Sequence, residues 1–149
     1  MSTPIQTQNP QNIKWLDRTW SQWIGLEDAL KPGYGPLHQP GIYRIRNGKL
    51  KKSLLYIGIS RDIRGRLFQL KNAMKKYNRG DRQSPPHWAG GCIRTHELRG
   101  DIIEVSWLQS IDSELERKGL ECDYIAAHRW FCRSNPECQF VSLDRRNID

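Results

Sequence analysis

The fold of this chain is decided by residues 40–70, which read PGIYRIRNGKLKKSLLYIGISRDIRGRLFQL. Two short runs of β-forming residues flank an Asn-Gly pair at positions 47–48, and Asn-Gly is a strong signal for the turn between two paired strands. We therefore predict strands near 41–47 and 53–60, joined as a hairpin.

Each predicted strand carries a tyrosine close to a glycine. Residues i and i+2 share one face of a strand, so Gly41 should lie beside Tyr43, and Gly58 beside Tyr56. The missing side chains predict room for a ligand next to each phenol. The competing interpretation is an ordinary hairpin whose tyrosines pack on a core, because tyrosine is common in strands.

The composition favours an anionic partner. The chain has 149 residues, with 24 Lys and Arg against 16 Asp and Glu, which gives a net charge of +8 and a pI near 9.6. This length fits one domain with a real core, and the charge favours nucleic acid or an anionic membrane surface. No apolar run reaches the length of a membrane span, and the first ten residues lack the apolar core of a signal peptide. We therefore expect a cytoplasmic protein without a membrane anchor.

The cysteines are spaced too widely for a C-x-x-C pair. We therefore predict reduced thiols rather than a disulfide framework or a zinc knuckle. The set His87, Cys92 and His96 does not have the spacing of known zinc ligands, so we expect no metal site there. The four cysteines are Cys92, Cys122, Cys132 and Cys138.

The segment before residue 40 has its own pattern. Residues 1–11 are polar and predict a disordered tail, whereas apolar residues recur at helical spacing from Asn12 to Leu30. This pattern predicts a helix rich in tryptophan that ends at Pro32, followed by a Pro/Gly connector. We divide the chain accordingly into 1–39, a main domain over 40–143 and a charged tail over 144–149.

A helix should begin at residue 61 or 62 and end near Tyr77. Its apolar stripe is spaced by four, three and four residues. Arg66 falls at the edge of this stripe, where an arginine either pairs structurally or has a function. The stripe consists of Ile63, Leu67, Leu70 and Met74, and the residues expected to point into solvent are Arg64, Lys71 and Lys75.

Residues 77–100 form a long, mostly basic stretch with few signals of regular structure. Such a stretch is either a nucleic-acid-contacting loop, for which His87 and Trp88 supply suitable groups, or a surface insertion. A short helix is predicted within it near 89–98. The β-forming residues 102–110 then predict a third strand, and 140–141 could add an edge strand.

The last long helix is predicted to begin after Ser113, which opens a capping-box pattern, and to end near Phe131. Its apolar stripe is expected to contain Leu115, Cys122, Ile125 and Cys132. Glu121 flanks this stripe in the middle of the helix. Glu114 lies in the first turn, where the helix dipole already accounts for an acid.

Two strand tyrosines, one arginine and one glutamate suit the hydrolysis of a phosphodiester with a single metal ion. A carboxylate can hold Mg²⁺ or Mn²⁺, and an arginine can neutralise charge on the phosphate. A phenol near a cation could take a proton from the attacking water.

These residues resemble the motifs of the GIY-YIG endonuclease superfamily. Residues 40–43 are similar to its first motif and residues 55–58 to its second. Arg66 follows Tyr56 by ten residues, as the family arginine does, and residues 120–125 resemble the helix that carries the metal-binding glutamate. The resemblance covers about 40–140.

The resemblance implies an α+β domain with a three-stranded antiparallel sheet flanked by helices, to which the predicted N-terminal helix would be an addition. It implies that Glu121 binds Mg²⁺ or Mn²⁺ and that Arg66 steadies the phosphate. One tyrosine, with Tyr56 preferred, would help to activate water, and Tyr43 would orient the water or share its proton.

The sequence also departs from the family pattern. Some members carry a histidine where this chain has Leu70, and some carry a lysine where it has Ile59. His87 could substitute for the missing proton-handling group. A late asparagine of certain members corresponds only loosely to Asn135.

The predicted function is therefore a metal-dependent endonuclease that acts on DNA. The alternatives are a nucleic-acid-binding module that has lost cleavage, or a nuclease for RNA or single strands. The small size suggests either low intrinsic specificity or a partner protein that supplies targeting. The residues predicted to contact nucleic acid are Arg61, Arg64, Lys71, Lys75, Arg79, Arg82 and His87.

Overall fold

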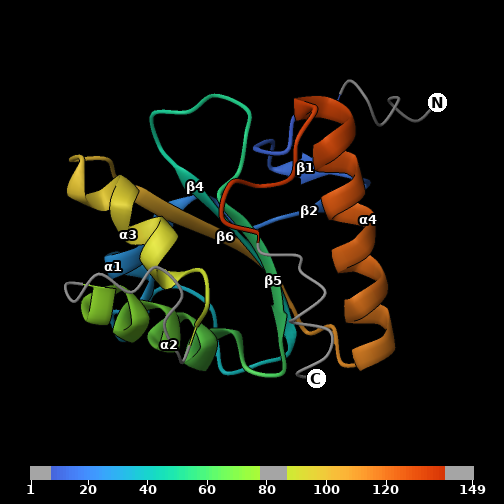
Figure 1. Ribbon diagram of the computed structural model, residues 1–149. Coiled ribbons are helices and arrows are strands. Elements are labelled where there is room, and N and C mark those ends of the chain that lie inside the picture. The colour runs from blue at the N-terminus through green and yellow to red at the C-terminus, as the bar shows by residue number, and fades with distance from the viewer. Residues whose placement is uncertain (1–7, 78–86, 140–149) are drawn as a thin grey trace.

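A computed structural model of the chain describes residues 8–77 and 87–139, and an antiparallel sheet lies at its centre (Figure 1). Within these residues the strand order is β3-β6-β4-β5. The three predicted strands are present, and a two-residue strand at the edge makes the sheet four-stranded. Their bounds are β3 Ile24–Gly25, β4 Gly41–Asn47, β5 Tyr56–Ser60 and β6 Ile103–Gln109.

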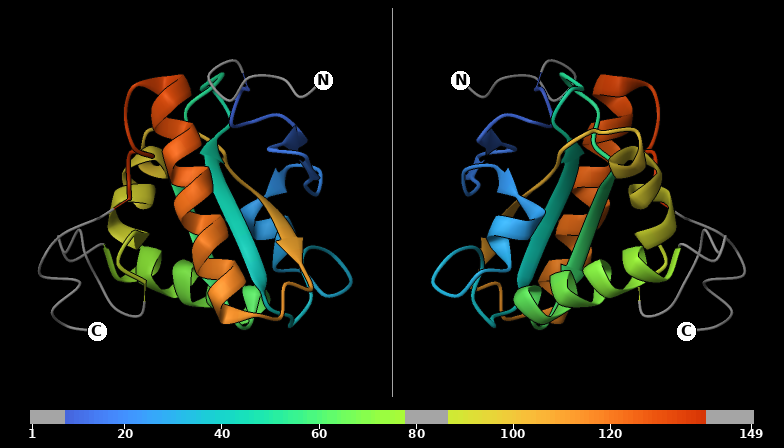
Figure 2. Two further views of the ribbon diagram at one scale, coloured as in Figure 1. Left: turned by 90° about the vertical axis from the view of Figure 1, so that its right-hand side faces the viewer. Right: turned by 90° about the vertical axis from the view of Figure 1, so that its left-hand side faces the viewer.

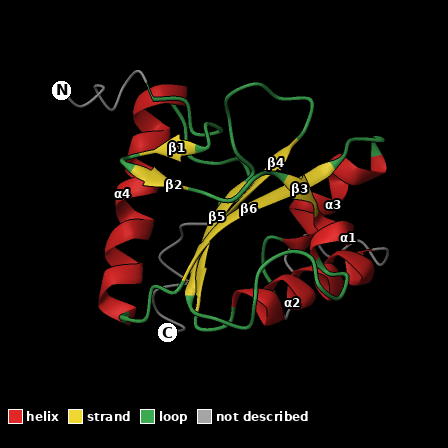
Figure 3. Ribbon diagram, turned by 180° about the vertical axis from the view of Figure 1, so that it is seen from behind, coloured by secondary structure: helices red, strands yellow, loops and turns green. Residues whose placement is uncertain are grey.

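Helices cover both faces of this sheet (Figure 2). On one face, Tyr43 and Ile45 pack with residues of α1 (Leu26–Ala29), α2 (Ile63–Lys76) and α3 (Gly90–Leu98). On the other face, Ile42 and Ile57 pack with α4 (Glu114–Cys132) and with tryptophans of the N-terminal segment. The predicted α+β architecture is confirmed, and Figure 3 shows the same layers from behind.

Helix α2 forms as predicted. The side chain of Asp62 caps its first turn by accepting a hydrogen bond from the backbone N–H of Gly65 at 2.9 Å. The whole predicted stripe from Ile63 to Met74 is buried. The short helix predicted near 89–98 is also present as α3.

Helix α4 begins at the predicted cap, where the Ser113 hydroxyl accepts from the N–H of Glu116 at 3.1 Å. The predicted apolar stripe, however, is wrong. Leu115 is 82% exposed and Cys122 is also exposed. The buried residues of this helix are instead Arg117, Tyr124, Ala127 and His128.

The predicted N-terminal helix is also wrong. The segment forms strands β1 (Lys14–Trp15) and β2 (Arg18–Thr19), which pair with each other, then β3 and the four-residue α1. Two of its tryptophans are buried against α4: the rings of Trp15 and Trp20 lie 4.6 and 5.1 Å from that of Tyr124. Packing around these rings decides the structure of the segment, whereas a helix would have turned them to different directions.

Arg44 holds the same segment from the sheet side. Its guanidinium lies 4.5 Å from the ring centroids of both Trp20 and Trp23, and it donates to the carbonyl of Pro10 at 2.6 Å. Gln11 donates to the carbonyls of Leu50 and Ser53 as well. The prediction of a disordered tail over 1–11 is therefore wrong for residues 8–11, and residues 1–7 lie outside the described part.

The segment after α4 runs along the open edge of β5. The N–H groups of Glu137 and Cys138 donate to the carbonyls of Leu54 and Leu55, and the side-chain amide of Gln139 bonds to both backbone polar groups of Ile57. These contacts satisfy backbone groups that an edge strand would otherwise leave unpaired. The edge strand predicted at 140–141 lies outside the described residues.

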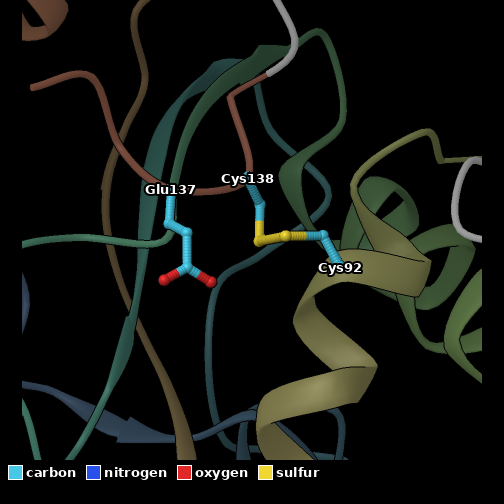
Figure 4. A group of neighbouring side chains, drawn as sticks. All are labelled: Cys92, Glu137 and Cys138. Atoms are coloured by element: carbon cyan, nitrogen blue, oxygen red, sulfur yellow. A yellow bond between two sulfur atoms is a disulfide. The ribbon is translucent and has the colours of Figure 1, made fainter.

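One prediction about the cysteines is wrong, because Cys92 of α3 and Cys138 form a disulfide (Figure 4). Cys122 and Cys132 are free. Because the two bonded cysteines are 46 residues apart, only the tertiary fold, which brings the segment after α4 next to α3, places them together. Among the described residues, no helix is long and apolar enough to cross a membrane.

Candidate active site

The two tyrosines of the predicted hairpin lie side by side on the face covered by α2 and α3. Their ring centroids are 6.0 Å apart, and both side chains are buried. Tyr43 pairs directly with Gly58 across the strands. A Cβ on Gly58 would lie 2.6 Å from the Tyr43 hydroxyl and 2.6 Å from a ring carbon of Tyr56. Gly58 is therefore needed so that both phenols can occupy this space.

The room for a ligand predicted beside each glycine is not there. The phenols themselves fill the space next to Gly58. At Gly41, a Cβ would lie 2.0 Å from the carbonyl of Leu108 in β6 and 2.6 Å from Ile63 in α2. Gly41 thus allows the sheet and α2 to approach closely, and any ligand must bind outside these two positions.

His87 is the third aromatic group of the cluster. It is fully buried, and its Nε2 lies 2.8 Å from the Tyr43 hydroxyl. The backbone N–H of Ala89 donates to its Nδ1 at 3.2 Å, so the neutral ring carries its proton on Nε2 and donates it to the Tyr43 oxygen. The ring also meets that of Tyr56 edge-on, with centroids 5.0 Å apart.

Arg66 and Glu121 reach this cluster from two different helices. Both are half-buried, Arg66 on α2 and Glu121 on α4. Arg66 hydrogen-bonds to Tyr43 and also donates to the side chain of Gln69 at 2.7 Å.

The pKa of Tyr43 shows how these groups act on one another. Burial raises it well above the usual 10, and the neighbouring Tyr56 raises it further. Arg66 opposes the rise through its charge and its hydrogen bond, whereas the negative charge of Glu121 adds to it. Tyr56, Arg66 and Glu121 therefore all lie close enough to Tyr43 to affect its pKa.

The donor set suits a hard cation. Glu121 offers carboxylate oxygens whose charge acts on Tyr43, and Mg²⁺ and Mn²⁺ prefer oxygen ligands. The half-buried position of Glu121 leaves part of its side chain open to solvent, from which an ion could bind.

The basic residues predicted to contact nucleic acid differ in their surroundings. The prediction that Arg64 points into solvent is wrong: its guanidinium donates to five backbone carbonyls, one at the last residue of α1 and four in the connector between α1 and β4. Lys71 is engaged too, at 2.9 Å from Glu27 and 3.8 Å from Glu97. Arg61 and Lys75 are exposed. Arg79 and Arg82 lie outside the described residues.

His87 had been predicted both as a nucleic-acid contact and as a substitute proton-handling group. Its complete burial disfavours direct contact with a nucleic acid surface. Its bond to Tyr43 is compatible with the second role. In the sequence, Leu70 stands where some family members carry a histidine, which suggests that another histidine takes that role. Nothing local in the sequence links His87 to Tyr43.

Comparison with known proteins identifies the family of this chain. The family model described as the GIY-YIG catalytic domain matches residues 39–131, which is well over half of the chain. The matched range contains both tyrosines, Arg66 and Glu121. No curated protein and no solved structure matched the chain. The chain belongs to the GIY-YIG family of nuclease catalytic domains.

Proposed function

We propose that this protein is a metal-dependent endonuclease that hydrolyses phosphodiester bonds in DNA. The observation that carries the proposal is the convergence on Tyr43 of groups from β5, α2, α4 and the segment before α3. A packed core has no need of an arginine and a glutamate beside two phenols, because each such group costs free energy unless it is paired.

Tyr43 acts as an orienting group in this proposal. Its raised pKa keeps the phenol protonated at neutral pH. Its oxygen accepts hydrogen bonds from His87 and Arg66, and because Tyr43 is as fully buried as His87, we assign it no direct contact with the phosphate. We assign abstraction of the proton from water to Tyr56.

Arg66 neutralises the phosphate. A guanidinium can donate two parallel hydrogen bonds to phosphate oxygens, and its hydrogen bond to Gln69 limits the orientations of the side chain. Glu121 would hold the divalent metal ion, which supplies positive charge for the phosphate and the leaving oxygen. His87 holds the Tyr43 hydroxyl in position.

The test is a cleavage assay with supercoiled, linear and single-stranded DNA and with RNA, in Mg²⁺ or Mn²⁺. Glu121→Ala should slow cleavage about 100-fold or more, as expected for the loss of a charged group that stabilises the transition state. Glu114→Ala is the matched control, because Glu114 lies on the same helix and its side chain is 70% exposed. Equal rates for wild type and Glu121→Ala would contradict the metal assignment.

The same assay separates the alternatives. Binding without cleavage by the wild type would favour a module that has lost catalysis, and faster cleavage of RNA or single strands would change the substrate class. Arg66→Ala should remove activity with little effect on the melting temperature. A large loss of stability in this variant would instead indicate a structural role for Arg66.

A further inference from the structure

A second group of metal-ligating side chains lies where α3 meets the segment along β5 (Figure 4). The sulfurs of Cys92 and Cys138 and a carboxylate oxygen of Glu137 all lie within 4.8 Å of one another. Both sulfurs are buried, whereas the Glu137 side chain is 55% exposed. The cluster thus has two soft ligands inside and one hard ligand at the solvent boundary.

A chain of hydrogen bonds orients the exposed carboxylate. His96, which is buried on α3, contacts the Glu137 carboxylate through Nε2. The amide nitrogen of Asn47 donates to His96 Nδ1 at 3.1 Å and to Asp101 at 2.6 Å. Because Nδ1 accepts a hydrogen bond, the neutral ring has its proton on Nε2 and donates it to Glu137.

The orientation of Asn47 is itself fixed, since its Oδ1 accepts from the backbone N–H of Lys49 at 2.9 Å. One buried histidine, whose ring is itself oriented by Asn47, therefore holds the exposed glutamate in place. Surface glutamates need no such support. Outer groups that fix a carboxylate or an imidazole are, however, a regular feature of metal sites, where they orient the ligand.

We propose that the reduced protein binds one thiophilic divalent cation, such as Zn²⁺, through Cys92, Cys138 and Glu137. His96 serves as the positioning residue for Glu137. Two thiolates select a soft or borderline ion rather than Mg²⁺, so this centre differs in chemistry from the oxygen-donor site at Glu121. Three protein ligands leave a fourth position for water.

The disulfide is the oxidised form of the same site. A dithiol reductant transfers two electrons and two protons to the Cys92–Cys138 bond, which yields two thiols while the reductant becomes a disulfide. Each thiol then loses one proton as the cation binds, because the thiolate is the ligand. The oxidised form lacks free thiolates and cannot bind the ion in this way.

Cadmium titration tests the proposal. In a Cys122→Ser/Cys132→Ser background, the only thiols left are those of the cluster. After reduction, Cd²⁺ should produce a thiolate-to-metal charge-transfer band that saturates at one ion per chain. The same protein in its oxidised form is the matched control and should give no band.

Variants locate the ligands. Cys92→Ser in this background should abolish the band, and Glu137→Gln and His96→Gln should each weaken Zn²⁺ binding by about 10- to 100-fold. Glu137 is exposed enough that its variant should fold normally. The proposal is overturned if the reduced background protein shows no band, or if neither Glu137→Gln nor His96→Gln changes the affinity. Because the readout is binding, it does not depend on nuclease activity.

Discussion

Replacing Gly58 by alanine tests whether the packing of the two tyrosines sets both stability and activity. The added Cβ would lie 2.6 Å from Tyr43 and from Tyr56, well inside any normal contact distance. Tyr43 cannot swing aside easily, since it is fully buried and bonded to His87. Overfilling a packed site of this kind costs about 1–3 kcal/mol. For a chain of this size, the melting temperature should fall by roughly 3–10 °C.

Activity should fall by more than this loss of stability explains. A shift of about 1 Å in a catalytic group can cost about 100-fold in rate, and either phenol must move to admit the methyl group. Gly119→Ala is the matched control, because a Cβ at that position of α4 meets no atom within 4 Å. Alanine there should stabilise the helix by about 0.5–1 kcal/mol and leave the cleavage rate unchanged.

The assay combines thermal unfolding with initial cleavage rates at a temperature where each variant is folded. A Gly58→Ala protein with wild-type stability would refute the packing argument. If the variant melts earlier but cleaves at the wild-type rate, the contact is structural only, and the positions of the phenols are not critical for the chemistry.

Three further predictions concern residues away from the phenols. Burial lowers the pKa of His128 in the folded protein below its ordinary 6.5. Between the folded and the unfolded pKa the unfolded chain binds more protons, so the free energy of unfolding should fall as the pH drops below about 6.5. Urea unfolding at several pH values measures this change. The slope in this window should be smaller in His128→Gln. Arg64→Gln should lower the melting temperature, because five backbone carbonyls lose their hydrogen-bond donor. Arg61→Gln, at an exposed position, should leave the melting temperature unchanged and reduce the salt dependence of DNA binding. Cys92→Ser should cost about 4 kcal/mol under oxidising, metal-free conditions, as estimated from the 46-residue separation, and a reductant should remove this difference in denaturant unfolding.

The elements that the sequence predicts well are those set by local signals. The strands around Tyr43 and Tyr56 follow from runs of β-formers beside an Asn-Gly pair, and α2 follows from a regular stripe with Asp62 as its cap. In each case the residues that decide the structure lie within one turn or one strand of each other. Tertiary packing then agrees with the local preference.

The wrong predictions concern segments whose structure is set by contacts with residues far away in the sequence. Apolar residues between 12 and 30, Trp20 and Trp23 among them, have helical spacing, but Trp20 packs on Arg44 and Trp15 packs on Tyr124 outside any helix. The disulfide joins cysteines 46 residues apart, which no spacing rule could have paired. For the site, the motifs identified Arg66 and Glu121 but could not show that His87 bonds to Tyr43.

The buried face of α4 differs from the predicted apolar stripe for a specific reason, and that reason affects the interpretation of Glu121. The buried face of this helix consists largely of residues with polar tips, each of which finds a backbone partner. Arg117 donates to the carbonyl of Ile111, Tyr124 to that of Trp15, and His128 accepts from the N–H of Leu54. A pattern based on hydrophobicity assigns such residues to the surface.

Glu121 nevertheless flanks the true buried face, four residues after Arg117 and three before Tyr124. Its buried neighbours along the helix each have a backbone partner that explains their position, as packing requires. The interactions of Glu121 include one with Tyr43: the negative charge of Glu121 raises the pKa of the Tyr43 phenol. Tyr43 stays protonated beside this charge at neutral pH, and a cation bound at Glu121 would offset the carboxylate and lower the pKa of Tyr43. We therefore expect the metal ion at Glu121, whose charge acts on Tyr43.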